Sequence, residues 1–354
     1  MNSATGSISS PLTKLLRQTD TRSLANHYAS QLQLCCPPTP TSHKLARTLH
    51  AQMITSGFKP RGHILNRLID IYSKSRDLNS ARLLFDAIPE PDIVARTTLI
   101  AALSNAGDLI HARDILNSTP LKIRDTVSYN AMITGYSHNN DGYNAVKLFS
   151  EMRRDQFRPD TFTFSSVLSA LALVVNDVRQ CQQLHCGVVK SGTETVVSVL
   201  NALVSLYVKC AMALSCLLSM DSARKLFNEM RVRDELTWTT MITGYVRIGE
   251  IDSAKLLFDG MTDKLQVAWN AMISGYVYNG RILEAIDMFR RMHLEGIMLD
   301  EFTFTSVLSA CANYGLSRHG KQLHGYILRT EFKSVAHFVL PVEQCLGDII
   351  LEMQ

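Results

Sequence analysis

The sequence lacks a long uninterrupted apolar run, although 46% of its 354 residues are hydrophobic. The longest run, Val167 to Val175, has about half of the roughly 18 residues that a membrane-spanning helix needs. We therefore expect no membrane insertion. Because charged residues make up 19% of the chain, the composition is typical of a globular protein and excludes wholesale disorder.

An excess of either charge is missing from most of the chain. The whole sequence has 36 basic and 32 acidic residues, and residues 1–60 alone hold six basic side chains against the single acid Asp20. The remainder is close to neutral, with 30 basic and 31 acidic side chains. A neutral surface does not bind polyanions by bulk electrostatics, so any nucleic-acid binding must come mainly from specific contacts.

Catalytic and metal-binding motifs are also lacking. None of the eight cysteines forms a C-x-x-C pair, and a chain this long needs no disulfide staples, which indicates buried thiols in a reducing compartment. His293-Leu-Glu295 has the H-x-E form of a zinc deaminase, but the required P-C-x-x-C does not follow. Cys181 and His185 share a predicted helix face but are too few ligands for a metal site. Since a glycine-rich phosphate loop and a nucleophile motif are missing too, we predict a non-enzymatic chain without metal or cofactor.

Internal repetition is what the sequence does contain, and it indicates an array of stacked units. One octapeptide recurs as YNAMITGY (129–136), WTTMITGY (238–245), WNAMISGY (269–276) and the weaker copies LNRLIDIY (65–72) and LNALVSLY (200–207). A second block, FTFSSVLSA (162–170), alternates with these copies and returns as FTFTSVLSA (302–310). A constant step of nine residues joins a tyrosine to an alanine in four pairs: Tyr72 and Ala81, Tyr136 and Ala145, Tyr245 and Ala254, and Tyr276 and Ala285.

Each unit has the pattern of two helices. In the first, Met132, Ile133 and Tyr136 recur at helical spacing, and the small residue Gly135 leaves room for a neighbouring helix to approach closely. In the second, an apolar stripe that begins at Ala145 has charged residues between its members. Strand patterns of alternating polarity are absent. Helix pairs that each expose an apolar face must stack to bury it, so we predict an all-α fold, an α-solenoid superhelix.

One unit departs from the constant spacing. The step from Tyr207 to Ala223 is sixteen residues instead of nine, which places an insertion of seven residues within 211–219. Seven residues are close to two turns at about 3.6 residues per turn, so they can lengthen one helix without rotating its neighbours out of phase. A bulged loop between the two helices fits the same spacing, and the periodicity leaves both alternatives open.

These units resemble pentatricopeptide repeats, specifically those of the plant PLS subclass, in which three repeat lengths alternate. The Trp-Leu-Gly-Tyr pattern of the rival tetratricopeptide repeat is missing. The resemblance implies a right-handed superhelix of stacked helix-turn-helix repeats that binds single-stranded RNA, roughly one base per repeat. The family's register places the recurrent Asn or Thr fifth in each repeat and gives an array over 26–336, with units 26–61, 62–92, 93–125, 126–160, 161–196, 197–234, 235–265, 266–300 and 301–336.

In the family that the repeats resemble, the fifth and last residues of each repeat choose the base. A side-chain amide offers a donor and an acceptor together, which match the edge of uracil, whereas the smaller threonine hydroxyl leaves room for a purine. A nearby carboxylate can fix the rotamer of either. Asparagine and aspartate also serve as helix caps, but these asparagines fall inside a predicted helix. Carried over, the uracil-type pairs are Asn66 with Asp92, Asn130 with Asp160, Asn201 with Asp234 and Asn270 with Asp300, and the guanine-type pair is Thr97 with Asp125.

Other positions of the register fit the family less well or have two interpretations. Weaker base reading is expected where no carboxylate pairs with the fifth residue, at Ser165, Thr239 and Thr305. The second residue of a repeat is wedged between neighbouring bases in the family. Packing within the protein explains a valine there equally well, and the residues concerned are Val94, Val127 and Val267.

The two ends of the chain lead to separate expectations. Residues 1–25 are rich in serine and threonine and hold three basic residues against one acid, which favours an organelle transit peptide, for the mitochondrion or alternatively the chloroplast. Residues 337–354 diverge from the repeat pattern. The E and DYW regions typical of editing factors in the PLS subclass do not follow, which indicates a truncated product.

The resemblance implies a sequence-specific RNA-binding adaptor in organelle RNA processing. Such a protein selects C-to-U editing sites, here with a deaminase or another editing-complex protein supplied by a separate chain, and has no DNA partner. A protein-interaction scaffold is the rival hypothesis, and an inactive truncated product is the third. Five of eight complete repeats pair Asn or Thr with Asp, and a peptide-binding groove has no need of that pairing.

Overall fold

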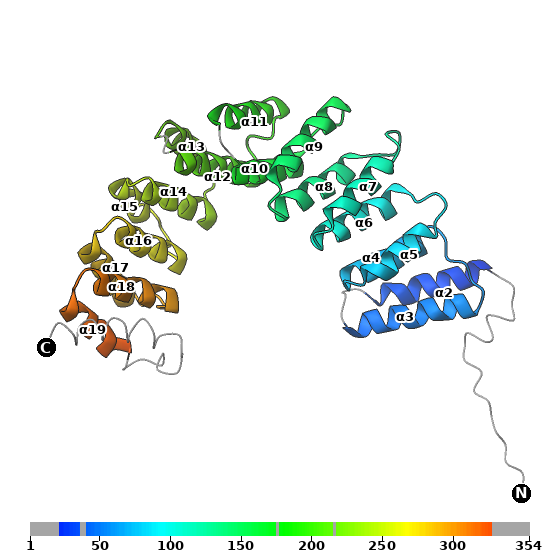
Figure 1. Ribbon diagram of the computed structural model, residues 1–354, viewed down its shortest axis with the longest axis horizontal. Helices are drawn as coiled ribbons and strands as arrows, with labels where there is room; N and C mark the ends of the chain where they lie inside the picture. The colour runs from blue at the N-terminus through cyan, green and yellow to red at the C-terminus, as the bar shows by residue number, and fades with distance from the viewer. Residues whose placement is uncertain (1–20, 36–39, 175–176, 215–216, 328–354) are drawn as a thin grey trace, which may run out of the picture. The chain divides into compact units, whose positions relative to one another are not determined.

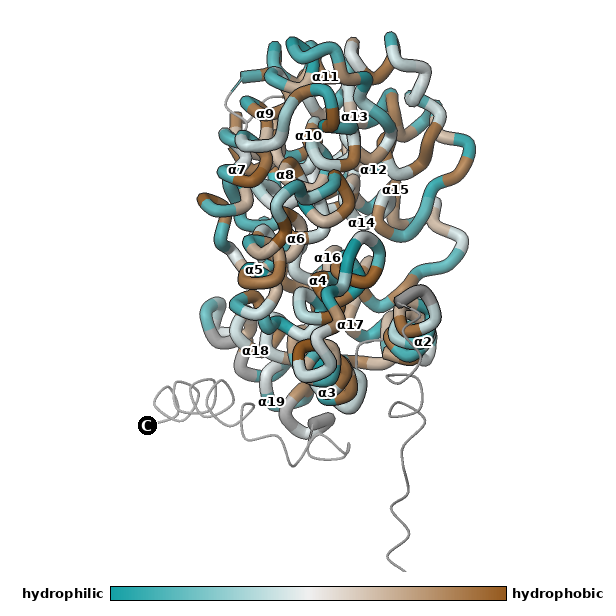
Figure 2. The backbone as a smooth tube through the Cα atoms, turned by 90° about the vertical axis from the view of Figure 1, so that its right-hand side faces the viewer, coloured by the Kyte–Doolittle hydropathy of each residue, from teal (hydrophilic) through white to brown (hydrophobic). Residues whose placement is uncertain are grey.

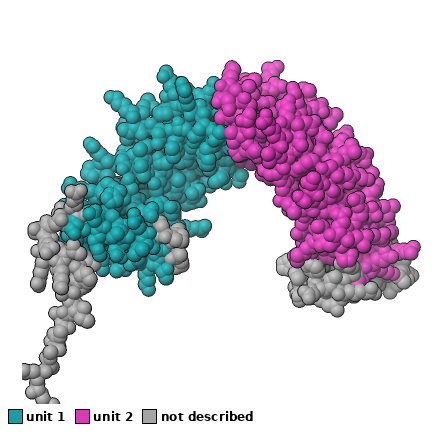
Figure 3. Space-filling view, turned by 180° about the vertical axis from the view of Figure 1, so that it is seen from behind, with its two compact units in different colours: residues 1–170 teal, residues 171–354 magenta. Residues whose placement is uncertain are grey.

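The computed structural model describes residues 21–35, 40–174, 177–214 and 217–327. Within these ranges the chain is helical and has no strand, which confirms the predicted all-α class. The chain divides into two compact units, residues 1–170 and residues 171–354, coloured teal and magenta in Figure 3. Residues 1–20 of the expected transit peptide and all of 337–354 lie outside the described residues.

Unit 1 is a row of helical pairs (Figure 1). The first helices α4, α6 and α8 lie side by side, and α5 and α7 each pack against the first helix before and after them. The bounds are α2 (Thr21–Gln33), α3 (Pro40–Thr55), α4 (His63–Lys74), α5 (Leu78–Asp86), α6 (Ile93–Asn105), α7 (Leu109–Ser118), α8 (Thr126–His138), α9 (Gly142–Arg154) and α10 (Thr161–Val174), whose last turn belongs to unit 2.

Unit 2 repeats this arrangement. The first helices α12, α14, α16 and α18 lie side by side, and α13, α15 and α17 each pack between two of them. The bounds are α11 (Val178–Ser191), α12 (Val197–Leu214), α13 (Leu217–Glu229), α14 (Glu235–Arg247), α15 (Ile251–Asp259), α16 (Gln266–Tyr278), α17 (Ile282–Leu294), α18 (Glu301–Asn313) and α19 (Ser317–Ile327). Each unit is therefore a stack of helical pairs, as the repeats predicted.

Aspartates mark where several of the first helices begin. Asp92, Asp125 and Asp234 precede α6, α8 and α14, and the carboxylate of each accepts a hydrogen bond from the backbone N–H three residues further on, over 2.8 to 2.9 Å. Such a cap satisfies one of the N–H groups that lack a partner in the first turn of a helix. The position of each first helix is therefore set locally, by the residue just before it.

Apolar and aromatic side chains form the core between the two helices of each pair and the next first helix. Hydrophilic and hydrophobic residues alternate along the helices, as Figure 2 shows. Phe227 meets Trp238 with ring centroids 4.7 Å apart, and Phe258 meets Trp269 at 4.8 Å, both edge to face. Edge-to-face pairs of buried aromatic rings are favourable beyond the area they bury. The same contact thus joins a second helix to the following first helix in successive repeats.

Glycines allow neighbouring first helices to approach closely, as predicted for Gly135. A Cβ atom placed on Gly135 of α8 would lie 2.3 Å from the Cβ of Ser104 in α6. At Gly275 of α16, the added atom would lie 2.6 Å from Cγ2 of Val246 in α14. Carbon atoms in contact are normally about 3.5–4.0 Å apart, so neither site accepts a side chain without movement.

The seven-residue insertion lengthens helices. The first helix α12 ends at Leu214, seven residues after Tyr207, whereas α8 ends two residues after Tyr136. The second helix α13 begins at Leu217, six residues before Ala223 rather than the usual three. The described part of the insertion, 211–214 and 217–219, is therefore helical.

Helix α12 is apolar as well as long. Of the helices in the described part of the chain, it alone could cross a membrane by length and composition. Half of its residues are buried, and it packs against α13 and α14 within unit 2.

Candidate nucleic-acid interface

Hydrogen bonds join all four of the predicted asparagine–aspartate pairs. Each asparagine lies inside a first helix, and its aspartate stands at the start of the next first helix, so every pair connects two neighbours in the stack. The asparagine Nδ2 donates to the carboxylate over 2.9 Å from Asn66 to Asp92, 3.1 Å from Asn130 to Asp160, 2.6 Å from Asn201 to Asp234 and 2.8 Å from Asn270 to Asp300.

The paired aspartates are also helix caps, so the capping contact and the contact with the asparagine occur in the same residue. Asp300 shows how: its Oδ1 accepts from the backbone N–H of Thr303 over 2.8 Å, while its Oδ2 accepts from Asn270 over 2.8 Å. Because a carboxylate has two oxygens and several lone pairs, one contact does not exclude the other. The cap holds the carboxylate in place, and the carboxylate in turn holds the asparagine.

Exposure differs among the four asparagines. Asn66, Asn201 and Asn270 are half-buried, whereas Asn130 is only 5% exposed. Asn66, Asn201 and Asn270 are therefore more accessible to a ligand than Asn130 is.

The predicted pair Thr97 and Asp125 is not joined by a hydrogen bond. The Asp125 carboxylate accepts from the backbone N–H of Ser128, and the backbone N–H of Asp125 donates to the Ser128 hydroxyl, which together form a capping box. The Thr97 hydroxyl is buried and has no hydrogen-bond partner in the described structure. A threonine hydroxyl sits on Cβ and reaches less far than an asparagine amide, which accounts for the missing contact. Thr97 borders a hollow of about 800 Å³ in unit 1, whose wall also includes Asp70.

The three weaker positions bond to their own helices instead of to a neighbour. The hydroxyls of Ser165, Thr239 and Thr305 each donate to the carbonyl oxygen four residues earlier, over 2.9, 2.7 and 2.8 Å. Hydroxyls inside helices commonly make this bond. No described contact orients these side chains toward the next repeat.

Exposed apolar side chains recur beside the asparagines. Val94, Val127 and Val267 are 55% to 59% exposed, so the alternative that they are plain core packing does not describe them. The same register position also carries exposed apolar residues that the sequence analysis left out: Phe162, Leu236 and Phe302. Each is the second residue of its predicted unit, so the repeat register would have located these larger apolar residues as it located the valines.

A hollow of about 510 Å³ in unit 2 brings these features together. Asn270 and Asp300 lie in its wall with the exposed apolar residues Val267 and Phe302. Arg247 borders it as well, with its guanidinium carbon 5.2 Å from the centre of the Tyr278 ring. An amide, apolar surfaces and a cation therefore face one space.

Basic side chains form a further series. Lys74, His138, Lys209 and Arg247 are all exposed, and each stands two residues after the recurring tyrosine of its first helix. Lys74 shares the unit 1 hollow with Thr97, as Arg247 shares the unit 2 hollow with Asn270. Lys74 is ion-paired with Asp70 of the same hollow over 2.9 Å, which offsets its charge, whereas Arg247 stands beside Asn270 as a cation that an anionic backbone can meet.

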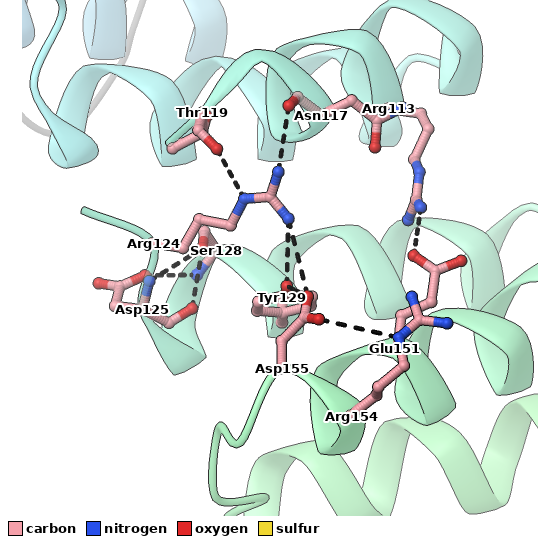
Figure 4. A network of polar contacts seen from close by, with 10 residues as sticks. All are labelled: Arg113, Asn117, Thr119, Arg124, Asp125, Ser128, Tyr129, Glu151, Arg154 and Asp155. Atoms are coloured by element: carbon pink, nitrogen blue, oxygen red, sulfur yellow. Dashed lines mark hydrogen bonds and ion pairs between the residues drawn. The ribbon is translucent and has the colours of Figure 1, made fainter. Parts of the chain in front are cut away.

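A polar network fixes the loop before α8 (Figure 4). Arg124 donates from Nε to the carbonyl oxygen of Thr119, over 2.8 Å, and from Nη1 to the hydroxyl of Tyr129, over 3.2 Å. The Tyr129 hydroxyl donates to Asp155 over 2.6 Å. This network connects the end of α7, the start of α8 and the end of α9. It therefore holds Asp125, the residue that follows the arginine, in a defined position.

Hydrogen bonds also lower the pKa of two of the paired aspartates, Asp300 and Asp234. Burial by itself raises the pKa of Asp300, but hydrogen bonds from Thr303, Asn270 and Gln266 outweigh burial and lower the pKa below its ordinary 3.8. The pKa of Asp234 is lowered in the same way. These carboxylates are thus ionised, and accept hydrogen bonds only, across the neutral pH range.

A pH prediction follows for Asp300. Because its folded-state pKa is lowered, the contact contributes stability that is fully present above the ordinary value of 3.8 and is lost as pH falls through the lowered value. An NMR titration of the Asp300 side-chain carbonyl carbon in the full chain should give a pKa below 3.8. A midpoint above 3.8 would contradict the described hydrogen bonds.

Metal ligands do not gather anywhere in the described ranges. No group of three or more His, Cys, Asp or Glu side chains is placed to hold an ion among those residues. The candidate interface consists of paired amides and carboxylates, exposed apolar side chains and scattered basic side chains, which recur along the stacked helical pairs. Such a molecule belongs to the helical-repeat proteins of the α-solenoid class.

Comparison with known protein families identifies the repeat. The PPR repeat family matches residues 124–172 and 264–313, and the PPR repeat matches residues 236–264. The pentatricopeptide repeat-containing protein At1g25360 of Arabidopsis thaliana is 54% identical over 311 residues, which cover 88% of this chain. The chain is a pentatricopeptide repeat protein.

The relatives are longer than this chain, which spans 39% of the length of At1g25360. Two other Arabidopsis thaliana proteins of the same description, one named chloroplastic and one mitochondrial, are 29% and 27% identical over 81% and 79% of the chain. The chain spans 25% and 20% of their lengths.

A solved structure shows the same fold. The pentatricopeptide repeat protein PPR10, crystallised in complex with an 18-nt psaJ RNA element, superposes with a TM-score of 0.67 at 16% identity. The match covers 94% of this chain and 52% of PPR10. The stack of helical pairs is therefore the pentatricopeptide solenoid.

Proposed function

We propose that this chain is a sequence-specific adaptor that binds single-stranded RNA, roughly one base per repeat. The observation that carries the proposal is the series of asparagines, each oriented by the aspartate that ends its own repeat, just before the next first helix. PPR10, which has the same fold, was crystallised with RNA, and this supports the nature of the ligand.

The chemistry of the site suits a base edge. After donating one N–H to its aspartate, each asparagine amide keeps a second N–H and a carbonyl lone pair for a ligand. Uracil offers an acceptor beside a donor and so matches this pair. Apolar side chains such as Val267 and Phe302 on either side of Asn270 can contact the faces of the base. Thr97 with Asp125 remains the proposed guanine-type position, with space for a purine in its hollow.

The finer parts of the proposal rest on the PLS-like alternation of repeat lengths and on the chain's N-terminal composition. We assign the chain to organelle RNA processing, with selection of C-to-U editing sites as the particular task and a deaminase or other editing protein supplied by another chain. Relatives named mitochondrial and chloroplastic support an organelle. The mitochondrion is our choice between the two, and residues 1–25 are the proposed transit peptide.

A peptide-binding scaffold is the competing function, and one comparison separates the two. The full chain should bind a single-stranded RNA with the core U-G-U-N-U-N-U at least tenfold more tightly than one in which adenine replaces all four uracils, because each mismatch typically costs about 1–3 kcal/mol in duplex DNA readout. Fluorescence anisotropy at one salt concentration measures both affinities. Equal binding of the two RNAs would contradict base reading.

A matched pair of variants gives the control. Asn270→Ala removes a proposed reading amide, whereas Asn228→Ala removes an exposed amide on α13 that makes no side-chain contact among the described residues and lies off the asparagine series. Only the first should reduce the preference for the uracil-containing RNA.

A further inference from the structure

We propose that Thr163, Thr237 and Thr303 are positioning residues for the reading asparagines, and that they set how strictly a repeat discriminates among bases. The inference rests on the proposed function and deepens it. These threonines are third in their predicted units.

The geometry is the same at all three places. The threonine hydroxyl lies 2.6 Å from Oδ1 of Asn130 at Thr163, 2.7 Å from Oδ1 of Asn201 at Thr237, and 2.7 Å from Oδ1 of Asn270 at Thr303. Each of these hydroxyls also lies 2.6 to 2.8 Å from the Oδ1 atom of the paired aspartate. All three threonines are at most 1% exposed, so water does not compete for these contacts.

The two contacts hold opposite ends of the amide. The carboxylate accepts hydrogen bonds only, so it must face the asparagine Nδ2. The hydroxyl has one hydrogen and lies between two acceptors, Oδ1 of the asparagine and Oδ1 of the aspartate, so the two oxygens share it in a three-centre hydrogen bond. A reversed amide would place Oδ1 against the carboxylate oxygens, and acceptors in contact are unfavourable. Each asparagine therefore presents its remaining N–H and lone pair in one fixed order before any base arrives.

Fixing the amide in advance affects selectivity. A preorganised side chain loses less conformational freedom when the right base binds. A wrong base leaves the held donor or acceptor unpaired, whereas a free amide can rotate to suit it. The hydroxyl should thus raise the ratio of affinities for right and wrong bases at its own position.

Asn66 provides the natural comparison. Its Nδ2 donates to Asp92, but the residue that corresponds to the threonines is the buried Ala95, which has no hydroxyl. No hydrogen bond to Oδ1 of Asn66 is found among the described residues. This amide is held at one end only, so the first of the four uracil positions should be read less strictly than the others.

Variants of Thr303 and Ala95 test this in opposite directions. Thr303→Val keeps the shape and removes the hydroxyl, and it should reduce uracil discrimination at the Asn270 position about three- to tenfold, the equivalent of one hydrogen bond. Thr303→Ser restores a hydroxyl and should restore discrimination. Ala95→Thr should raise discrimination at the Asn66 position. The readout is the ratio of affinities for RNAs that differ only in that one base, measured on the full chain.

The outcomes separate the inference from the proposed function. An unchanged ratio in Thr303→Val, with RNA binding and folding retained, overturns the role of the threonines alone. Equal weakening for every base would likewise show a merely structural role. Absence of RNA binding by the unaltered chain overturns both proposals.

A second measurement needs no RNA. NMR order parameters of the asparagine side-chain amides should be higher at Asn270 than at Asn66, and Thr303→Val should bring Asn270 down to the value of Asn66. Equal order at Asn66 and Asn270 in the unaltered chain would contradict the positioning role.

Discussion

Replacing Gly135 by alanine is expected to lower the free energy of unfolding by about 1–3 kcal/mol, the usual cost of inserting a group into a packed core. The added Cβ would stand 2.3 Å from Cβ of Ser104, which is attached directly to the α6 backbone and cannot rotate away. The two helices must therefore separate. Thermal unfolding followed by circular dichroism should show a loss of several degrees, since about 1 kcal/mol corresponds to roughly 2–4 °C in a chain of 150–250 residues.

Gly325 in α19 is the matched control. It is also a helical glycine, but no atom of the described residues lies within 4 Å of a Cβ placed there. Gly325→Ala should leave stability unchanged or raise it by up to about 1 kcal/mol, because alanine has the higher helix propensity. Equal effects of the two substitutions on stability would contradict the claim that Gly135 is needed for the close packing of α8 on α6.

Replacing Asn270 by threonine is expected to move the preferred base at one position from uracil toward guanine. The hydroxyl is shorter than the amide, and the hollow of about 510 Å³ then has room for a purine between Val267 and Phe302. The penalty for uracil should be about 1–3 kcal/mol, by comparison with mismatches in duplex DNA readout. Asn270 is the better site for this change than Asn130, which is only 5% exposed.

The other positions of the bound RNA serve as internal controls for this change. Among RNAs that differ at a single base, Asn270→Thr should change the affinity only for those altered at the base that the α16 repeat reads. The control Asn228→Thr on α13 should change none of these affinities. A uniform loss of affinity at every position would mean that Asn270 supports the fold rather than reads a base.

Local spacing was enough to predict the helical pairs. The step from Tyr136 to Ala145 returns three times, and a side chain's place on a helix depends only on its near neighbours. The insertion at 211–219 could not be placed in this way, because seven residues complete nearly two turns and leave the periodicity intact. Only the packing of α12 and α13 decides where those residues go.

The candidate site was predicted less completely than the fold. The register brought Asn270 and Asp300 together, since both belong to one repeat and the stack repeats regularly. The threonine contacts were missed because Thr303 and Asn270 meet only through space, 33 residues apart in sequence. The missing hydrogen bond between Thr97 and Asp125 depends on the length of the threonine side chain. The repeat register gives the position of a residue in its repeat but not how far its side chain extends.

The most direct test of base reading is a selection of random single-stranded RNA on the full 354-residue chain. The account predicts enrichment of a motif that reads, from 5′ to 3′ along the chain, U, G, U, any base, U, any base, U. The first uracil, at Asn66, should be the least strict of the four. If protein shown by circular dichroism to be folded and helical enriches no motif, the chain does not read bases, and a peptide-binding scaffold or an inactive product becomes the better account.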